Sequence, residues 1–126
     1  MLSYLRGFAA VSGFLAVALG AFAAHGLKAK LSVYGADIWQ TAVFYQFVHT
    51  LLLLVVVTND KFATHNLKQI KTFGLMLTSG IVIFCGSLYV IALTGFSKLG
   101  MITPIGGVLF LLSWLYLIRM FRALNS

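Results

Sequence analysis

Four long stretches of this sequence contain no formally charged residue, and they constrain the fold more than any other feature. The stretches are residues 7–27, 38–59, 72–97 and 99–118, each of about 20 residues or more. Because a helix rises about 1.5 Å per residue, about 20 apolar residues cross the roughly 30 Å hydrocarbon core of a bilayer. We therefore predict an all-α integral membrane bundle of four transmembrane helices in up-and-down order.

The composition leaves little chain for anything outside a membrane. Of the 126 residues, 61% are hydrophobic and 9% are charged, whereas an average soluble domain has about 25% charged residues. This excludes a soluble globule, and the short loops exclude a nucleotide-binding fold or a soluble catalytic module. We expect one transmembrane domain over residues 1–126, with spans at about 5–24, 38–58, 71–94 and 100–119.

The net charge of +7 is explained by membrane topology better than by nucleic acid binding. Cytoplasmic ends of membrane spans collect Lys and Arg, which also meet anionic lipid headgroups. The predicted topology places three basic residues, Lys28, Lys30 and Lys98, on one side. It places six on the other side, namely Arg6, Lys61, Lys68, Lys71, Arg119 and Arg122. We therefore predict that both termini lie in the cytoplasm, with membrane lipids as partners.

The first span has an alternative interpretation as a cleavable signal peptide. Arg6, the apolar stretch after it and Ala21-Phe22-Ala23 resemble the basic, hydrophobic and small-residue parts of such a peptide. We expect an uncleaved span instead, because the stretch is long enough to cross the bilayer. After it, Leu27, Leu31 and Tyr34 have the spacing of one helix face, which predicts a short amphipathic interfacial helix at about 27–36.

Small residues recur at helical spacing and predict close helix packing. In the first span Gly13 and Gly20 continue a face of alanines, and Gly106 and Gly107 follow Pro104 in the fourth. Helix association in lipid depends on such close contacts, and we expect a homo-oligomer, with a membrane protein partner as a further alternative. The expected packing residues are Gly13, Gly20, Gly86, Ser87, Gly106 and Gly107.

A few polar side chains within the spans are candidates for a binding site. Gln46 and His49 are three residues apart, so they are expected to share a helix face, and polar groups at that depth should face inward. Trp39 fits an aromatic belt at the membrane surface, and Thr103 is expected to cap a helix that begins at Pro104. The ligand-binding candidates are His25, Tyr45, Gln46, His49 and Thr103.

The two histidines support either a structural or a cofactor interpretation. His25 and His49 fall toward the same ends of adjacent helices and could ligate haem or a metal together, with Cys85 as a further ligand. We favour hydrogen bonding between helices, which is the common role of buried polar residues in membrane bundles. We therefore expect no cofactor and no metal site.

The sequence does not favour an enzyme. No carboxylate lies within an expected span, which argues against the usual proton-coupled transporters and against hydrolases with paired carboxylates. No phosphate-binding glycine loop, paired CxxC or metalloprotease histidine spacing is present. A haem-binding or redox component is the alternative, and it depends only on the two histidines and the cysteine.

Four motifs in order resemble one known family. They are residues 20–27 (GAFAAHGL), Tyr45-Gln46 with His49, residues 86–89 (GSLY) leading to 93–95 (LTG), and residues 99–107 (LGMITPIGG). They resemble the domain-of-unknown-function 423 family of small bacterial inner-membrane proteins. Ala23 and Cys85 depart from the family pattern, in which Gly and Ser are common. The resemblance implies four helices and a supporting role in the cell envelope, and it brings no catalytic residues.

Two functional hypotheses follow. The first is a structural or interaction protein that stabilises the bacterial cytoplasmic (inner) membrane and assembles through small-residue helix faces. The alternative is a module that binds or conducts a lipid, a quinone or a small solute through the His25, Gln46 and His49 cluster.

Overall fold

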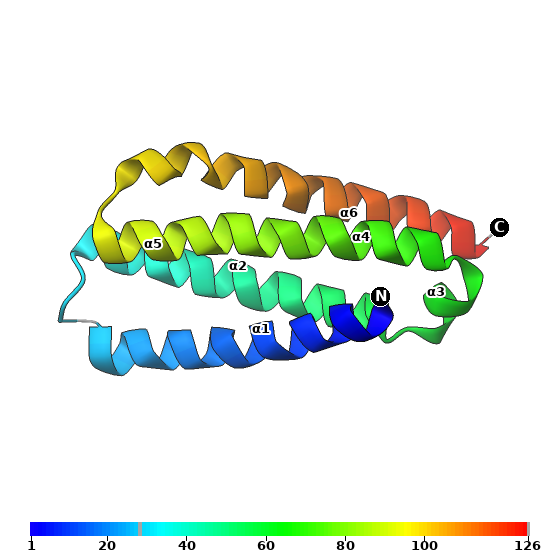
Figure 1. The fold of residues 1–126 in the computed structure, drawn as a ribbon, viewed down its shortest axis with the longest axis horizontal. Helices are drawn as coiled ribbons and strands as arrows, with labels where there is room; N and C mark the ends of the chain where they lie inside the picture. Colours follow the sequence, from blue (N-terminus) through cyan, green and yellow to red (C-terminus); the bar gives the residue numbers. More distant parts are fainter. Residues whose placement is uncertain (28, 126) are drawn as a thin grey trace.

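The computed structural model describes residues 1–27 and 29–125, which form four long helical spans (Figure 1). The all-α class predicted from the sequence is confirmed, since the described residues contain helices and no strand. In chain order the elements are α1 (Leu2–Phe22), η1 (Ala23–Leu27), α2 (Val33–Val57), α3 (Asp60–His65), α4 (Leu67–Gly80), η2 (Ile81–Cys85), α5 (Gly86–Thr94), η3 (Ser97–Met101) and α6 (Thr103–Asn125).

Each span is long and apolar enough to cross a membrane. The spans are Leu2–Leu27, Val33–Val57, Leu67–Thr94 and Ser97–Asn125, and we call them the first to fourth spans. At the ends near the termini the third and fourth spans exceed their expected bounds, because charged residues such as Lys68 and Arg122 continue these helices. Their long apolar stems can cover lipid while the charge reaches water.

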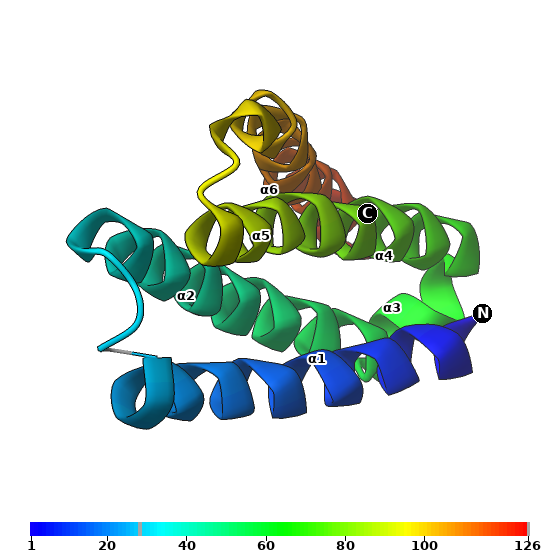
Figure 2. The ribbon, with the colours of Figure 1, turned by 60° about the vertical axis from the view of Figure 1, so that its left-hand side comes forward.

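The spans run up and down, and both termini lie at the same end, which we call the terminal end (Figure 1). The second and third spans form a central pair. α1 packs chiefly against α2, and α6 packs chiefly against α4 and η2. Figure 2 shows α1 and α6 on opposite sides of this pair, with α6 at an angle to α4 and α5.

The main apolar core lies toward the terminal end. It includes the fully buried Phe73, Ile70 and Leu53, and a smaller cluster around Trp39 and Leu27 lies toward the other end. At the terminal end Arg6 Nε also donates a hydrogen bond of 2.9 Å to the carbonyl oxygen of Val57, the last residue of α2. A basic group at a helix C-terminus satisfies a free carbonyl and suits the helix dipole.

The separate amphipathic helix predicted at 27–36 is wrong. Leu27 ends η1, and α2 begins at Val33 because the Ser32 hydroxyl accepts a 2.9 Å hydrogen bond from the backbone of Gly35. A serine in this position is a strong helix N-cap. Tyr34 therefore belongs to the first turn of α2, whereas Lys28, part of the same prediction, lies outside the described residues.

The connection between the second and third spans contains the short helix α3 and two helix caps. Asn59 caps α3 by accepting from the backbone of Lys61 and Phe62, and Asn66 caps α4 by accepting from Gln69. The Phe62 side chain is buried and its ring lies 5.5 Å from that of Phe121. This corner therefore closes the terminal end of the bundle.

Candidate functional site

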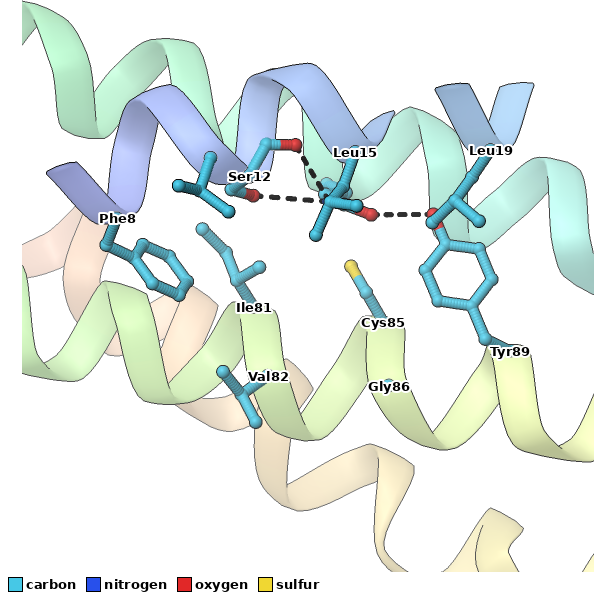
Figure 3. Close-up of a pocket in the computed structure, with 11 residues that line it drawn as sticks. Phe8, Ser12, Leu15, Leu19, Ile81, Val82, Cys85, Gly86 and Tyr89 are labelled. Carbon is cyan, nitrogen blue, oxygen red and sulfur yellow. Dashed lines mark hydrogen bonds between the residues drawn. The ribbon is translucent and has the colours of Figure 1, made fainter. Parts of the chain in front are cut away.

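A cavity lies between the first and third spans, where these two helices diverge. Near the terminal end Leu5 of α1 packs directly on Gly74 of α4, so that a Cβ atom at Gly74 would collide with the leucine side chain. Further along, the helices separate around a space of about 250 Å³, shown in Figure 3. We call this space the cleft, and it is lined by Phe8, Val11, Ser12, Leu15, Leu19, Gln46, Ile81, Val82, Cys85, Gly86 and Tyr89.

Three polar side chains from three spans meet at the cleft. The Gln46 amide of α2 donates hydrogen bonds of 2.9 Å to the Ser12 carbonyl and 3.2 Å to the Ser12 hydroxyl. The Tyr89 hydroxyl of α5 donates to Gln46 Oε1 at 2.6 Å. Behind them, the Ser12 and Thr50 hydroxyls lie 2.7 Å apart. This polar network joins α1, α2 and α5, and Figure 3 shows part of it along the cleft wall.

The end of the cleft away from the termini is closed by aromatic contacts. Trp39 is buried, and its indole nitrogen donates a 2.9 Å hydrogen bond to the carbonyl of Leu19. Its ring meets Tyr89 edge-on at 4.7 Å. The expectation that Trp39 belongs to an aromatic belt is therefore wrong, because its hydrogen bond is made inside the protein and not at the membrane surface.

Cys85 and Gly86 form part of the same cleft. The Cys85 side chain is buried, and Figure 3 shows its sulfur directed into the space beside Tyr89. A Cβ atom at Gly86 would meet nothing within 4 Å. The prediction that Gly86 packs against another helix is therefore wrong within this chain, because the first span has diverged from the third at this level.

A second cavity, of about 430 Å³, lies between α2 and α6. The His49 ring stacks on Phe110 at 3.7 Å and meets Trp114 edge-on at 6.0 Å, and Tyr45 lies parallel to it at 5.8 Å. We call this group the aromatic box. The cavity is lined by Tyr45, His49, Phe84, Pro104, Gly107, Val108, Phe110, Leu111 and Trp114.

Both ring nitrogens of His49 have hydrogen-bond partners. Trp114 Nε1 donates to His49 Nε2 at 3.1 Å, so Nε2 must be the unprotonated nitrogen. Nδ1 then carries the hydrogen and donates to the Tyr45 carbonyl at 2.8 Å. The imidazole is neutral and engaged on both sides, which is the structural role expected from the sequence.

The two histidines do not form a shared site. His25 lies in η1 with its side chain exposed, whereas His49 lies about 24 Å along α2 from Val33 at 1.5 Å per residue. His49 also faces α6, and Cys85 lines the cleft on the other side of α2. These positions do not suit paired imidazole ligation of haem, and no group of three His, Cys, Asp or Glu side chains in the described residues could hold a metal.

The single polar cluster expected from the sequence is divided. Gln46 belongs to the cleft, while Tyr45 and His49 belong to the aromatic box. Thr103 pairs with Ser87, whose hydroxyl is 2.6 Å away, and this bond links α5 to α6. Thr103 is itself the first residue of α6 and directs its hydroxyl to Ser87, so the predicted capping role is also wrong.

The other expected packing residues differ in how tightly they pack. A Cβ atom at Gly106 would collide with the backbone nitrogen of Phe84, so the backbones of α6 and η2 touch. At Gly20 the nearest atom is a Val43 methyl at 3.3 Å, and at Gly13 it is a Thr50 methyl at 3.7 Å. Gly107 has only ordinary contact, at 3.9 Å from the Phe84 ring.

Several residues of the site were not predicted. Ser12 and Thr50 have small polar side chains that are common inside membrane helices, and only their pairing across two helices identifies them. Trp114 lies 65 residues from His49 in the sequence. Gly74 and Gly80 also make close contacts, with Leu5 and Phe110. Only Gly80 carries a signal in the sequence, because Ser87 follows it at a distance of seven residues.

Comparison with known proteins is consistent with this architecture. The family model described as "Protein of unknown function (DUF423)" matches residues 19–107. The chain is 43% identical over 110 residues to the UPF0382 membrane protein YwdK of Bacillus subtilis, covering 86% of this chain and 88% of that protein. It is 47% identical over 109 residues to a UPF0382 membrane protein of Staphylococcus epidermidis, covering 86% of this chain and 87% of that protein.

No solved structure matches this chain. The residues matched by the family model include Gln46, His49, Tyr89 and Gly106. The relatives are named as membrane proteins, and the chain matches them over nearly their whole length. The chain therefore belongs to the DUF423 family, a family of unknown function whose members include the UPF0382 membrane proteins.

Proposed function

We propose that this protein is a multi-pass component of the bacterial cytoplasmic (inner) membrane that binds an uncharged apolar molecule in the cleft. The observation that carries the proposal is a cavity of about 250 Å³ with apolar walls and a polar network on one side. None of the described residues that line it carries a charge. Binding sites for small molecules are commonly concave and mostly apolar, with a few placed polar groups.

The cleft is placed to admit a molecule from the lipid phase. Val11, Leu15 and Val82 line it and are also exposed on the outer surface of the bundle, so its mouth faces outward between the spans. A lipid chain or a quinone could therefore enter sideways without passing through water. This route favours a binding module over a conducting pore, because the cleft opens sideways to the lipid phase, whereas a pore would open to water at both ends of the bundle.

We propose no catalytic role for the chain. The polar groups that chemistry would need are used in bonds between spans: Gln46 with Ser12 and Tyr89, and His49 with Trp114. Such bonds stabilise helix association in lipid by about 0.6 kcal/mol each. The polar residues then serve structure and recognition.

The proposal is tested by filling the cleft. Gly86→Leu adds a side chain where a Cβ atom has nothing within 4 Å, and Gly7→Leu does the same on α1 outside the cleft. We expect native mass spectrometry to show 1-methoxydecane bound to the wild type and to Gly7→Leu. Gly86→Leu should lose it, and equal binding to both leucine variants would overturn the proposal.

The second candidate is a structural or interaction protein that forms a homo-oligomer. It is favoured by the outer spans, which each pack on one side and leave large apolar side chains exposed, including Phe14 on α1 and Leu111 on α6. The mass of the assembly in the same spectra tests it. A monomer that carries the decyl probe would favour binding over assembly, and a second protein retained with the complex would indicate a membrane protein partner.

For orientation, we propose that the terminal end lies in the cytoplasm. Six basic residues lie at this end, as given above, and of the residues that the structure describes Lys30 and Lys98 lie at the other. The distribution follows the tendency of basic residues to remain inside. A reporter active only in the cytoplasm, fused after the C-terminus, is expected to be active, and activity of an export-dependent reporter there would reverse the assignment.

A further inference from the structure

The orientation of the Gln46 amide is determined by its surroundings. The nearest polar atom to one end of the amide is the Ser12 backbone carbonyl, at 2.9 Å, which can only accept a hydrogen bond. The NH₂ group must therefore face Ser12, and Oε1 must face Tyr89. Since Oε1 can only accept, Tyr89 must donate its single hydroxyl hydrogen to Gln46.

The hydrogen bonds of Gln46 and Tyr89 leave acceptor lone pairs for a ligand. The Gln46 amide nitrogen donates to the carbonyl and hydroxyl of Ser12, and the Tyr89 hydrogen points to Gln46. The Gln46 amide and the Tyr89 hydroxyl thus both donate within the protein. Gln46 Oε1 has a second lone pair and Tyr89 Oη has its own, and no described residue donates to either.

We propose that the cleft selects an uncharged apolar molecule that carries a hydroxyl group, which donates its hydrogen to Gln46 Oε1 or Tyr89 Oη. This inference rests on the proposed function and names the ligand class of the same cleft. A ligand whose only polar atom is an acceptor gains no hydrogen bond from Tyr89 unless Tyr89 leaves Gln46. Long-chain alcohols, diacylglycerols and quinols share the required donor.

The depth of the polar network supports this class. At about 1.5 Å per residue, Ser12 lies about 15 Å from the start of α1 and Gln46 about 16 Å from the end of α2, both measured from the terminal end. This is near the middle of a hydrocarbon core about 30 Å thick. Charged headgroups do not reach that depth without large cost, whereas a single hydroxyl on an apolar body does.

The test uses two probes that differ only in the donor. Equimolar 1-decanol and 1-methoxydecane are added to the purified protein, and native mass spectrometry gives the ratio of the two bound forms. We expect the alcohol to exceed the ether about fivefold on the wild type, which is the effect of one ordinary hydrogen bond. The Gly86→Leu protein measured in the same mixture corrects for non-specific uptake.

Two variants test whether Gln46 and Tyr89 cause the preference for the alcohol over the ether. Gln46→Met combined with Tyr89→Phe removes both acceptors and should reduce the ratio to about one, through loss of bound alcohol. Tyr89→Phe alone leaves Gln46 Oε1 with both lone pairs free, so the alcohol preference should persist or increase. Circular dichroism on each variant confirms that the helices are retained.

The outcomes separate this inference from the proposed function. Equal binding of alcohol and ether to the wild type overturns the hydroxyl inference and leaves the proposed function intact, whereas no specific binding of either probe overturns both. Persistence of the preference in the double variant also overturns the inference. A final arm with dioctanoylglycerol and a decyl-substituted quinol, compared as competitors of 1-decanol, distinguishes a lipid source from a quinol source.

Discussion

The first and fourth spans both pack on the central pair, but they are held by different means. α6 touches η2 through its backbone at Gly106, and the Ser87–Thr103 bond adds a polar link close to this contact. α1 touches the third span closely at Leu5 and Gly74 and then diverges, so that its connection with that span beside the cleft runs through the Gln46 network. Close glycine contact closes one side of the bundle, while polar bonds hold the other side together around a cavity.

The largest expected effect comes from adding one methyl group to the closed side. Gly106→Ala places a Cβ atom against the backbone nitrogen of Phe84, which cannot move aside, so we expect a loss of about 3 kcal/mol in unfolding free energy. Gly107→Ala is the matched control, because its Cβ atom would have ordinary contact at 3.9 Å. Unfolding by SDS titration measures both, and equal stabilities would contradict the backbone contact.

A smaller effect is expected on the open side. Gln46→Leu breaks the bonds to Ser12 and Tyr89 and leaves the tyrosine hydroxyl without its acceptor, which should cost about 1.5 kcal/mol. Thr41→Val on the exposed face of α2 is the control. Hydrogen exchange should accelerate in α1 more than in α6, and a uniform acceleration would indicate that the network does not specifically hold α1.

The smallest effect is expected in the aromatic box. Trp114→Phe keeps a ring but removes the donor to His49 Nε2, so we expect a loss of about 0.6 kcal/mol, typical of a hydrogen bond between membrane helices. Because the Tyr45 carbonyl still accepts from Nδ1, nitrogen NMR should show His49 protonated at Nδ1 as before, with the Nε2 resonance shifted by the loss of its donor. Tyr116→Phe, on the same helix, should leave both values unchanged, and an unshifted Nε2 resonance in Trp114→Phe would contradict the bond from Trp114.

The spans could be predicted from the sequence because a charge-free run of membrane length has few alternatives. The partners of each side chain could not. Gln46 and His49 are about 60° apart around α2 at 100° per residue, which would be one face on an outer helix. Because α2 is a central helix with neighbours on several sides, that angle is enough to direct Gln46 toward α1 and α5 and His49 toward α6.

Gly86 illustrates the same limit for packing residues. A glycine in a membrane helix allows close approach, but whether another helix comes near depends on how the spans diverge. Gly106 meets a backbone and Gly86 meets open space, although both occur in similar glycine-containing motifs. Residue type therefore indicates where contact is permitted, and the three-dimensional arrangement decides where it is made.

The π-helical segment η2 gives the third span a tolerance of chain length that an ordinary helix would not have. A π turn closes with i→i+5 bonds and holds one more residue than an α turn, and η2 lies between the two cavities, with Cys85 at one and Phe84 at the other. Deleting one residue within Ile81–Cys85 would let the segment close as an α turn with α5 in nearly the same orientation, so Tyr89 and Ser87 would still face Gln46 and Thr103. The same deletion within α4 would rotate the residues that follow by about 100° and would turn both side chains away from their partners, so within the third span only η2 can absorb the loss of a residue.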